Sequence, residues 1–113
     1  MSVDLTEVSA KLNLASDCMT RYYAGVESRL RTASLGVEGY VKLTADTELG
    51  YADCRGRWQL VLRRNTTFVE PLCNSSRNMR MLCVPKISVL EEHLLELAEE
   101  LADNIQCLLV DAR

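Results

Sequence analysis

A chain of 113 residues, 48% of them hydrophobic, can bury one core without structural metals or disulfides and is too short for two ordinary domains. No segment approaches the roughly 18 consecutive apolar residues that a membrane span requires. The start, Met1-Ser2-Val3-Asp4, also lacks the basic region of an export signal. We therefore expect one cytoplasmic α+β domain spanning residues 1–113, without a membrane partner.

The net charge of −3 is unevenly distributed along the chain. Residues 1–54 carry −3, residues 55–87 carry +6 and residues 88–113 carry −6. A basic middle beside an acidic end can form a surface for an anionic partner, or the two blocks can neutralise each other within the fold. We take mutual neutralisation as the default expectation.

The five cysteines are widely spread, odd in number and without a Cys-x-x-Cys pair. With only one histidine to join them, they indicate neither a disulfide framework nor a zinc site. We expect most of them to be small, reduced, buried hydrophobic side chains, and we expect no metal or cofactor.

The first predicted helix runs from about Leu5 to Ser34, with Asp4 as its N-cap. A helix of about 30 residues would measure about 45 Å, more than a small sheet can cover. It should either project past the core or break near Gly25, where helix propensity is lowest. Its apolar stripe consists of Val8, Leu12, Ala15, Met19, Tyr22, Val26, Leu30 and Ala33.

Alternating apolar and polar residues predict an antiparallel meander after this helix. The strands are expected at 37–43, 48–54 and 57–64, with a fourth at 67–70 that Pro71 stops. The turn Arg55-Gly56 makes a hairpin whose acidic and basic strands can pair. Trp58 shares a face with the leucines of its strand, so we expect it in the core.

Residues 72–87 fit two structures. Three consecutive N-cap residues at 74–76 favour a short helix from Arg77 to Val84. The alternation of residues 79–84 would also suit an edge strand. We prefer the helix.

The last predicted helix begins with a capping box, Ser88-Val89-Leu90-Glu91, and carries its acids on one face. The expected fold is α+β: a long N-terminal helix, a three- to four-stranded antiparallel meander, a short helix and a long C-terminal amphipathic helix. One sheet face cannot cover both helical stripes completely. The remaining apolar surface, which favours a homodimer, is expected at Val8, Leu12, Ile105 and Leu108.

Catalytic chemistry has little support in the residues. His93, the one histidine, lies on the acidic helix, where an exposed side chain is the simplest interpretation. Cys54 could be activated by Arg55 and Arg57, but we prefer the interpretation that it is an ordinary turn cysteine. The sequence contains no phosphate loop, dinucleotide fingerprint or His-x-x-x-His motif. We therefore expect no enzyme activity.

Two kinds of binding remain. Long amphipathic helices and segregated charge favour a protein-binding or regulatory module that docks on another protein or on itself. The alternative is nucleic-acid binding, or inhibition of a nucleoprotein machine, through the basic middle of the chain. Its candidate binding residues are Arg55, Arg57, Arg63, Arg64, Arg77, Arg80 and Lys86.

Four short motifs carry a resemblance to a wider group of proteins. They are Leu49-Gly50-Tyr51, Gly56-Arg57-Trp58-Gln59-Leu60, Pro71-Leu72 and Ser76-Arg77, followed by the acidic helix. Together they resemble small bacterial proteins of this length that have no assigned activity. The resemblance implies the order helix, meander, acidic helix, and it implies no functional site.

Overall fold

The computed structural model describes residues 4–112 and shows an α+β arrangement, as predicted. A single four-stranded antiparallel sheet has the strand order β1-β2-β3-β4, so each strand pairs with its neighbour in the chain. The elements are α1 (Leu5–Thr32), β1 (Gly39–Lys42), β2 (Thr47–Cys54), β3 (Arg57–Arg64), β4 (Phe68–Pro71), the 3₁₀ turn η1 (Leu72–Asn74), α2 (Arg77–Cys83), the 3₁₀ turn η2 (Val84–Lys86) and α3 (Ile87–Asp111).

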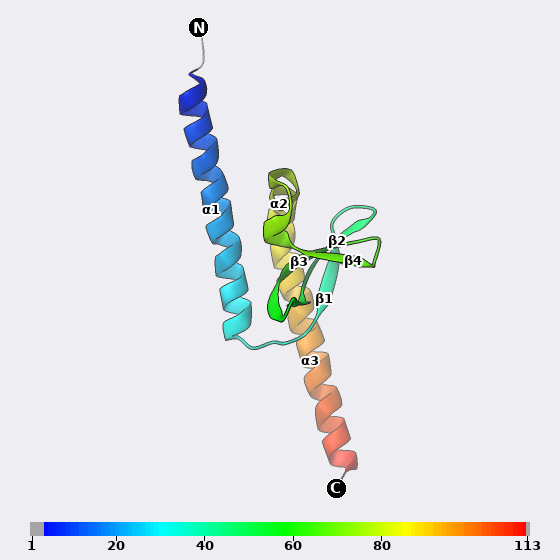
Figure 1. Cartoon of the computed structure of the whole chain (residues 1–113). Helices are drawn as coiled ribbons and strands as arrows, with labels where there is room; N and C mark the ends of the chain where they lie inside the picture. Colours follow the sequence, from blue (N-terminus) through cyan, green and yellow to red (C-terminus); the bar gives the residue numbers. More distant parts are fainter. Residues whose placement is uncertain (1–3, 113) are drawn as a thin grey trace.

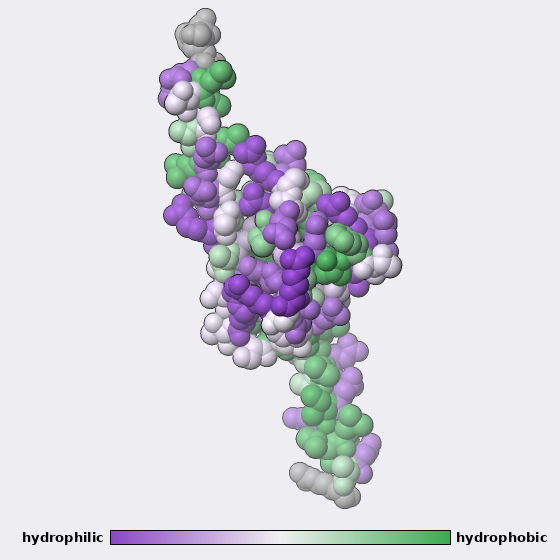
Figure 2. All heavy atoms as spheres, viewed as in Figure 1, coloured by the Kyte–Doolittle hydropathy of each residue, from purple (hydrophilic) through white to green (hydrophobic). Residues whose placement is uncertain are grey.

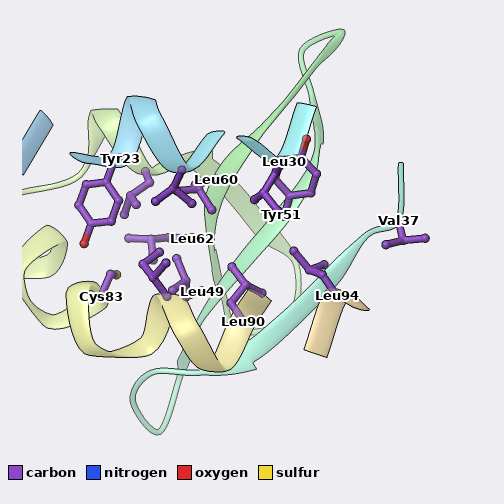
Figure 3. Close-up of a cluster of buried hydrophobic side chains, with 13 residues drawn as sticks. Tyr23, Leu30, Val37, Leu49, Tyr51, Leu60, Leu62, Cys83, Leu90 and Leu94 are labelled. Atoms are coloured by element: carbon purple, nitrogen blue, oxygen red, sulfur yellow. The ribbon is translucent and has the colours of Figure 1, made fainter. Parts of the chain in front are cut away.

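One face of the sheet packs against both long helices. Leu49 lies opposite Leu62 and Tyr51 opposite Leu60 in the β2–β3 register, so the four side chains share one face. All four are buried, and Figure 3 shows the labelled core side chains gathered between the sheet and the helices. The helices cover this face with Tyr23, Val26 and Leu30 from α1 and with Ile87, Leu90 and Leu94 from α3.

The molecule is elongated because both helices extend beyond this core. Its extents are 77 × 29 × 24 Å and its radius of gyration is 17.9 Å, against about 13 Å for a compact domain of this length. In Figure 1 the two helices run in the same direction but are staggered. The start of α1 and the end of α3 therefore project from opposite ends of the body.

Helix α1 projects and does not break. It continues through Gly25 to Thr32, and its predicted N-cap is confirmed because the Asp4 carboxylate accepts the amide proton of Thr6 at 2.9 Å. The helix ends two residues earlier than predicted. Ser34 already has a φ of 52°, which no helical residue adopts.

The connection into α3 corrects one prediction and confirms another. Ser76 caps α2 by accepting the amide proton of Met79, so the segment is a helix and not an edge strand. The predicted capping box at 88–91 is wrong, however. The 3₁₀ turn η2 leads directly into α3 at Ile87, so Ser88 lies inside the first helical turn.

The second face of the sheet is partly closed by long side chains. The Tyr40 ring lies across Gly50, and the Arg63 guanidinium carbon lies 3.6 Å from the centre of that ring. Arg63 also pairs with Glu48 at 2.9 Å, which confirms the predicted pairing across the hairpin. Val61, which lies opposite Gly50 on this face, is fully buried in this layer.

Two charged side chains of α1 replace the missing part of β4. Because β4 ends at Pro71, the first half of β3 has no strand on that side. There the Glu27 carboxylate accepts the amide proton of Leu60 at 2.8 Å, and Arg31 donates to the carbonyl oxygen of Trp58 at 2.9 Å. Backbone groups at a sheet edge need such partners when they are partly buried, so these bonds position α1 against the sheet.

Glycine-to-alanine changes at two positions should have opposite effects. In Gly50→Ala the new methyl group would meet the Tyr40 ring and lie 2.8 Å from the carbonyl oxygen of Gly39. We expect it to lower the free energy of unfolding by about 1–3 kcal/mol. Gly25→Ala, in open space on α1, should raise it by up to about 1 kcal/mol. Urea unfolding measures both, and equal effects would contradict the close approach of Tyr40.

The Glu27→Ala variant tests the bond to the β3 edge. It leaves the half-buried Leu60 amide without an acceptor, and we expect a loss of about 1–3 kcal/mol in the free energy of unfolding. The matched control is Ser28→Ala, an exposed neighbour on the same helix, which should change stability by less than about 0.5 kcal/mol. Urea unfolding compares them. Faster hydrogen exchange at Leu60 should accompany the loss, and unchanged exchange would contradict the capping role.

Candidate interaction surface

The largest uncovered apolar feature of α3 is the continuation of its core-facing stripe. Helical spacing places Leu101, Ile105, Leu108 and Leu109 on the side that buries Leu90 and Leu94 nearer the helix start. These four residues, which we call the distal α3 stripe, are between 45% and 68% exposed. Figure 2 shows apolar atoms gathered along this projecting end.

Helix α1 carries a shorter exposed apolar stripe, which we call the α1 stripe. Leu5, Val8 and Leu12 are between 44% and 83% exposed. They lie on the side that buries Tyr23 and Val26 further along the helix. The predicted leftover surfaces on both helices are thus present, and they lie at opposite ends of the body (Figure 1).

The projecting half of α3 lacks the local features that stabilise a helix end. Its last turn, residues 108–111, contains no basic residue and ends in Asp111, which faces the negative end of the helix dipole. Helices of about 12–15 residues are marginal in water without tertiary packing. About 13 residues of α3 follow Ala98, the last residue of the helix that packs against the core, and all of them are exposed.

The predicted basic binding residues fall into separate groups. Arg55 and Arg57 lie at the β2–β3 turn, whereas Arg63 and Arg64 lie at the other end of β3. Arg64 lies seven residue steps along β3 from Arg57, a distance of about 23 Å. Lys86 belongs to η2, near the start of α3.

Four of these basic side chains bind groups within the chain. Arg63 pairs with Glu48, and Arg64 lies 3.4 Å from Glu70. The α2 residues reach α1: Arg77 donates to the Ser16 hydroxyl at 3.4 Å and Arg80 to the Thr20 hydroxyl at 3.1 Å. These residues make bonds within the fold: the sequence predicted the pairing across the hairpin, but not the bonds from α2 to α1.

The basic middle of the chain and the acidic helix α3 are not joined by direct ion pairs among the described residues. Within residues 4–112, no ion pair joins residues 55–87 to α3, and the acid that α3 does pair is Glu91, with Arg29 of α1 at 3.1 Å. Four of the six remaining acids of α3 recur on the side opposite the stripe, because residues three and four apart share a helix face. They are Glu92, Glu96, Glu99 and Asp103, whereas Glu100 and Asp111 lie on one flank of the stripe.

The cysteines correct another expectation. Only Cys83 among the five is buried, and burial raises the pKa of its thiol to about 11. Cys18, Cys73 and Cys107 are exposed and Cys54 is half-buried, so most cysteines are not core residues. All five are free thiols in the structure.

The residues considered for catalysis lie on different elements, with Cys54 at the end of β2 and His93 on α3. His93 is half-buried beside Gly39, and within residues 4–112 no group of three or more His, Cys, Asp or Glu side chains could hold a metal. A cavity of about 140 Å³ lies between α1, β3 and α2, lined by Tyr23, Glu27 and Arg80 among others. It is smaller than the roughly 300–1,000 Å³ of typical ligand sites.

Comparisons with protein-family models, curated proteins and solved structures found no match to this chain. The resemblance to small bacterial proteins therefore stays an expectation. Among residues 4–112, no helix combines the length and the apolar character needed to cross a membrane.

Thiol labelling should distinguish the cysteines. At neutral pH we expect a maleimide to modify Cys18, Cys73 and Cys107 rapidly in the folded protein, because they are exposed. Cys83 should react only after unfolding, because it is buried and its raised pKa leaves little thiolate. Mass spectrometry of the labelled peptides measures each rate. Labelling of Cys83 as fast as Cys107 would contradict its burial, and Cys54 reacting fastest would support an activated thiol.

Proposed function

We propose that this chain is a non-enzymatic protein-binding or regulatory module that acts in the cytoplasm and self-associates through its projecting helices. The distal α3 stripe carries the proposal. Four neighbouring leucine and isoleucine side chains are about half or more exposed on a helix that has no other packing there. Contiguous bare apolar surface of this kind is typical of protein interfaces.

Covering the stripe would supply substantial free energy. Full burial of a leucine or isoleucine side chain contributes roughly 1.5–3 kcal/mol, and each of these still has about half of that available. Self-association doubles the contribution, because both copies bury the same residues. Association itself costs about 4–15 kcal/mol, so a dimer of moderate affinity is the expected result.

The charge distribution supports a protein partner more than a nucleic acid. The acids of α3 back the projecting stripe and would repel phosphate groups. Several of the basic residues are held in bonds within the fold, and the others lie on different elements. The bare apolar stripe would contribute nothing to the binding of phosphate groups, whereas it could contact an apolar surface of a protein.

Introducing a charge into the stripe should abolish self-association. We expect the full chain to change from monomer to dimer between about 1 µM and 1 mM. In Leu101→Glu a charge would be buried in the interface, and the dissociation constant should rise by about 100-fold or more. Sedimentation equilibrium across this concentration range measures the change.

A matched control lies on the same helix. Val110 is as exposed as the stripe residues but lies two turns from Asp103, on the acidic side. Val110→Glu should leave the dissociation constant unchanged within about twofold. A wild-type chain that stays monomeric at the highest concentration would refute self-association, and equal effects of the two variants would remove the stripe from the interface.

A further inference from the structure

We propose that two copies of this chain pair through their distal α3 stripes as antiparallel helices. A two-fold axis passes at the level of Asp103, so that Leu101 of one copy faces Ile105 of the other. This inference rests on the proposed self-association and specifies its interface, its register and its symmetry. Four features of α3 lead to it.

The first feature is the layer in which the partner must lie. Ile87, Leu90 and Leu94 are covered by the chain's own sheet, and the same side of the helix is bare from Leu101 onward. A helix packs on another helix at about 8–10 Å, close to the separation of a sheet layer from its neighbour. A helix continuing from the end of the sheet would therefore cover the stripe without changing the direction of α3.

The second feature is that the apolar positions of the stripe are nearly symmetric about position 103. About position 103, Leu101 mirrors Ile105, Ala98 mirrors Leu108, and Leu97 mirrors Leu109. An antiparallel partner of identical sequence therefore places apolar residues opposite apolar residues along the whole overlap. Such an isologous contact closes on itself as a dimer. A contact between the α1 stripe of one copy and α3 of the next, in the orientation that they share in the monomer, would repeat into a filament instead (Figure 1).

The third feature is the distribution of charge around the stripe. Ala102 and Asn104 flank the stripe and are neutral. Glu99 and Asp103 lie on the opposite side of the helix, whereas Glu100 and Asp111 lie on the same flank as Asn104. In the antiparallel register about position 103, Glu100 is level with Gln106 of the partner and Asp111 with Leu95, so no like charges are placed opposite each other.

The fourth feature is length. With Leu101 opposite Ile105, the overlap runs from Leu95 to Asp111 of each helix, which is about 17 residues or about 25 Å. Its ends lie beside Leu97 and Ala98, which are partly buried against the core of their own chain. A longer overlap would run into the sheet, and a shorter one would leave Leu108 bare. An interface of this length lies at the lower end of specific interfaces, near or below about 1,200 Å².

Mixing variants of opposite charge tests the register. Leu101→Glu and Ile105→Lys, each alone, should weaken self-association by about 100-fold. In an equimolar mixture, Glu at 101 of one chain would face Lys at 105 of the other, while Ile105 and Leu101 restore the second contact. We expect a heterodimer with an affinity within about tenfold of the wild type. Native mass spectrometry of full-length chains in reducing buffer identifies it.

The control mixture combines Leu101→Glu with Leu101→Lys, which face each other only if the helices are parallel. The antiparallel register predicts that this mixture stays monomeric. Association of the control mixture without association of the first would overturn the proposed register. If both single variants are monomeric and neither mixture associates, the stripe still mediates self-association but the pairing proposed here is wrong.

Two further outcomes separate this inference from the function on which it rests. A wild-type chain that remains monomeric would exclude a second copy as the partner of the stripe, and both proposals of self-association would fail. Single variants that still dimerise would place the interface elsewhere, for example on the α1 stripe, and would overturn only the α3 pairing. Circular dichroism should show that each variant is folded, because both positions are exposed and lie outside the core.

Discussion

The structure depends on a mismatch between the length of its helices and the size of its sheet. Four strands span about 19 Å across the sheet, whereas α1 and α3 are about 42 Å and 37 Å long. Both helices lie on the same face, so the sheet covers only part of each. Because the helices are staggered, the uncovered parts lie at opposite ends of the body, and each carries a bare apolar stripe.

The position of α1 is held by specific polar bonds as well as by burial. Glu27 and Arg31 bind backbone groups of β3 beyond the end of β4, and the Tyr23 hydroxyl donates to the carbonyl oxygen of Arg80. Arg77 and Arg80 of α2 reach hydroxyl groups on α1 from the other side. Arginines that the charge pattern suggested for an external anion thus help to hold the helix against the core.

The periodicity of the sequence predicted the fold class, the order of the elements and the apolar side of each helix. It could not predict contacts between residues far apart in the chain. The bond from Glu27 to the β3 edge depends on where β4 ends, and the burial of Val61 depends on Tyr40 crossing Gly50. The predicted capping box at Ser88 was wrong for a related reason, because the preceding 3₁₀ turn continues directly into α3. The sequence predicted that apolar surface would remain exposed near Ile105. It could not predict how many residues of α3 would be exposed, because that depends on where the sheet ends.

The same side of α3 serves first as core and then as exposed surface, with no change of helix direction or break in the stripe. A partner that covers the distal residues would also stabilise the helical conformation of the whole element, because helix formation is cooperative. Ile87, Leu90 and Leu94 lie in that element and form part of the core. If the proposed association takes place, it would be linked to folding through α3, because a partner that binds only the folded chain stabilises it increasingly as its concentration rises. In such an arrangement the unfavourable charge at the end of α3 is tolerated, since packing and not local propensity maintains the helix.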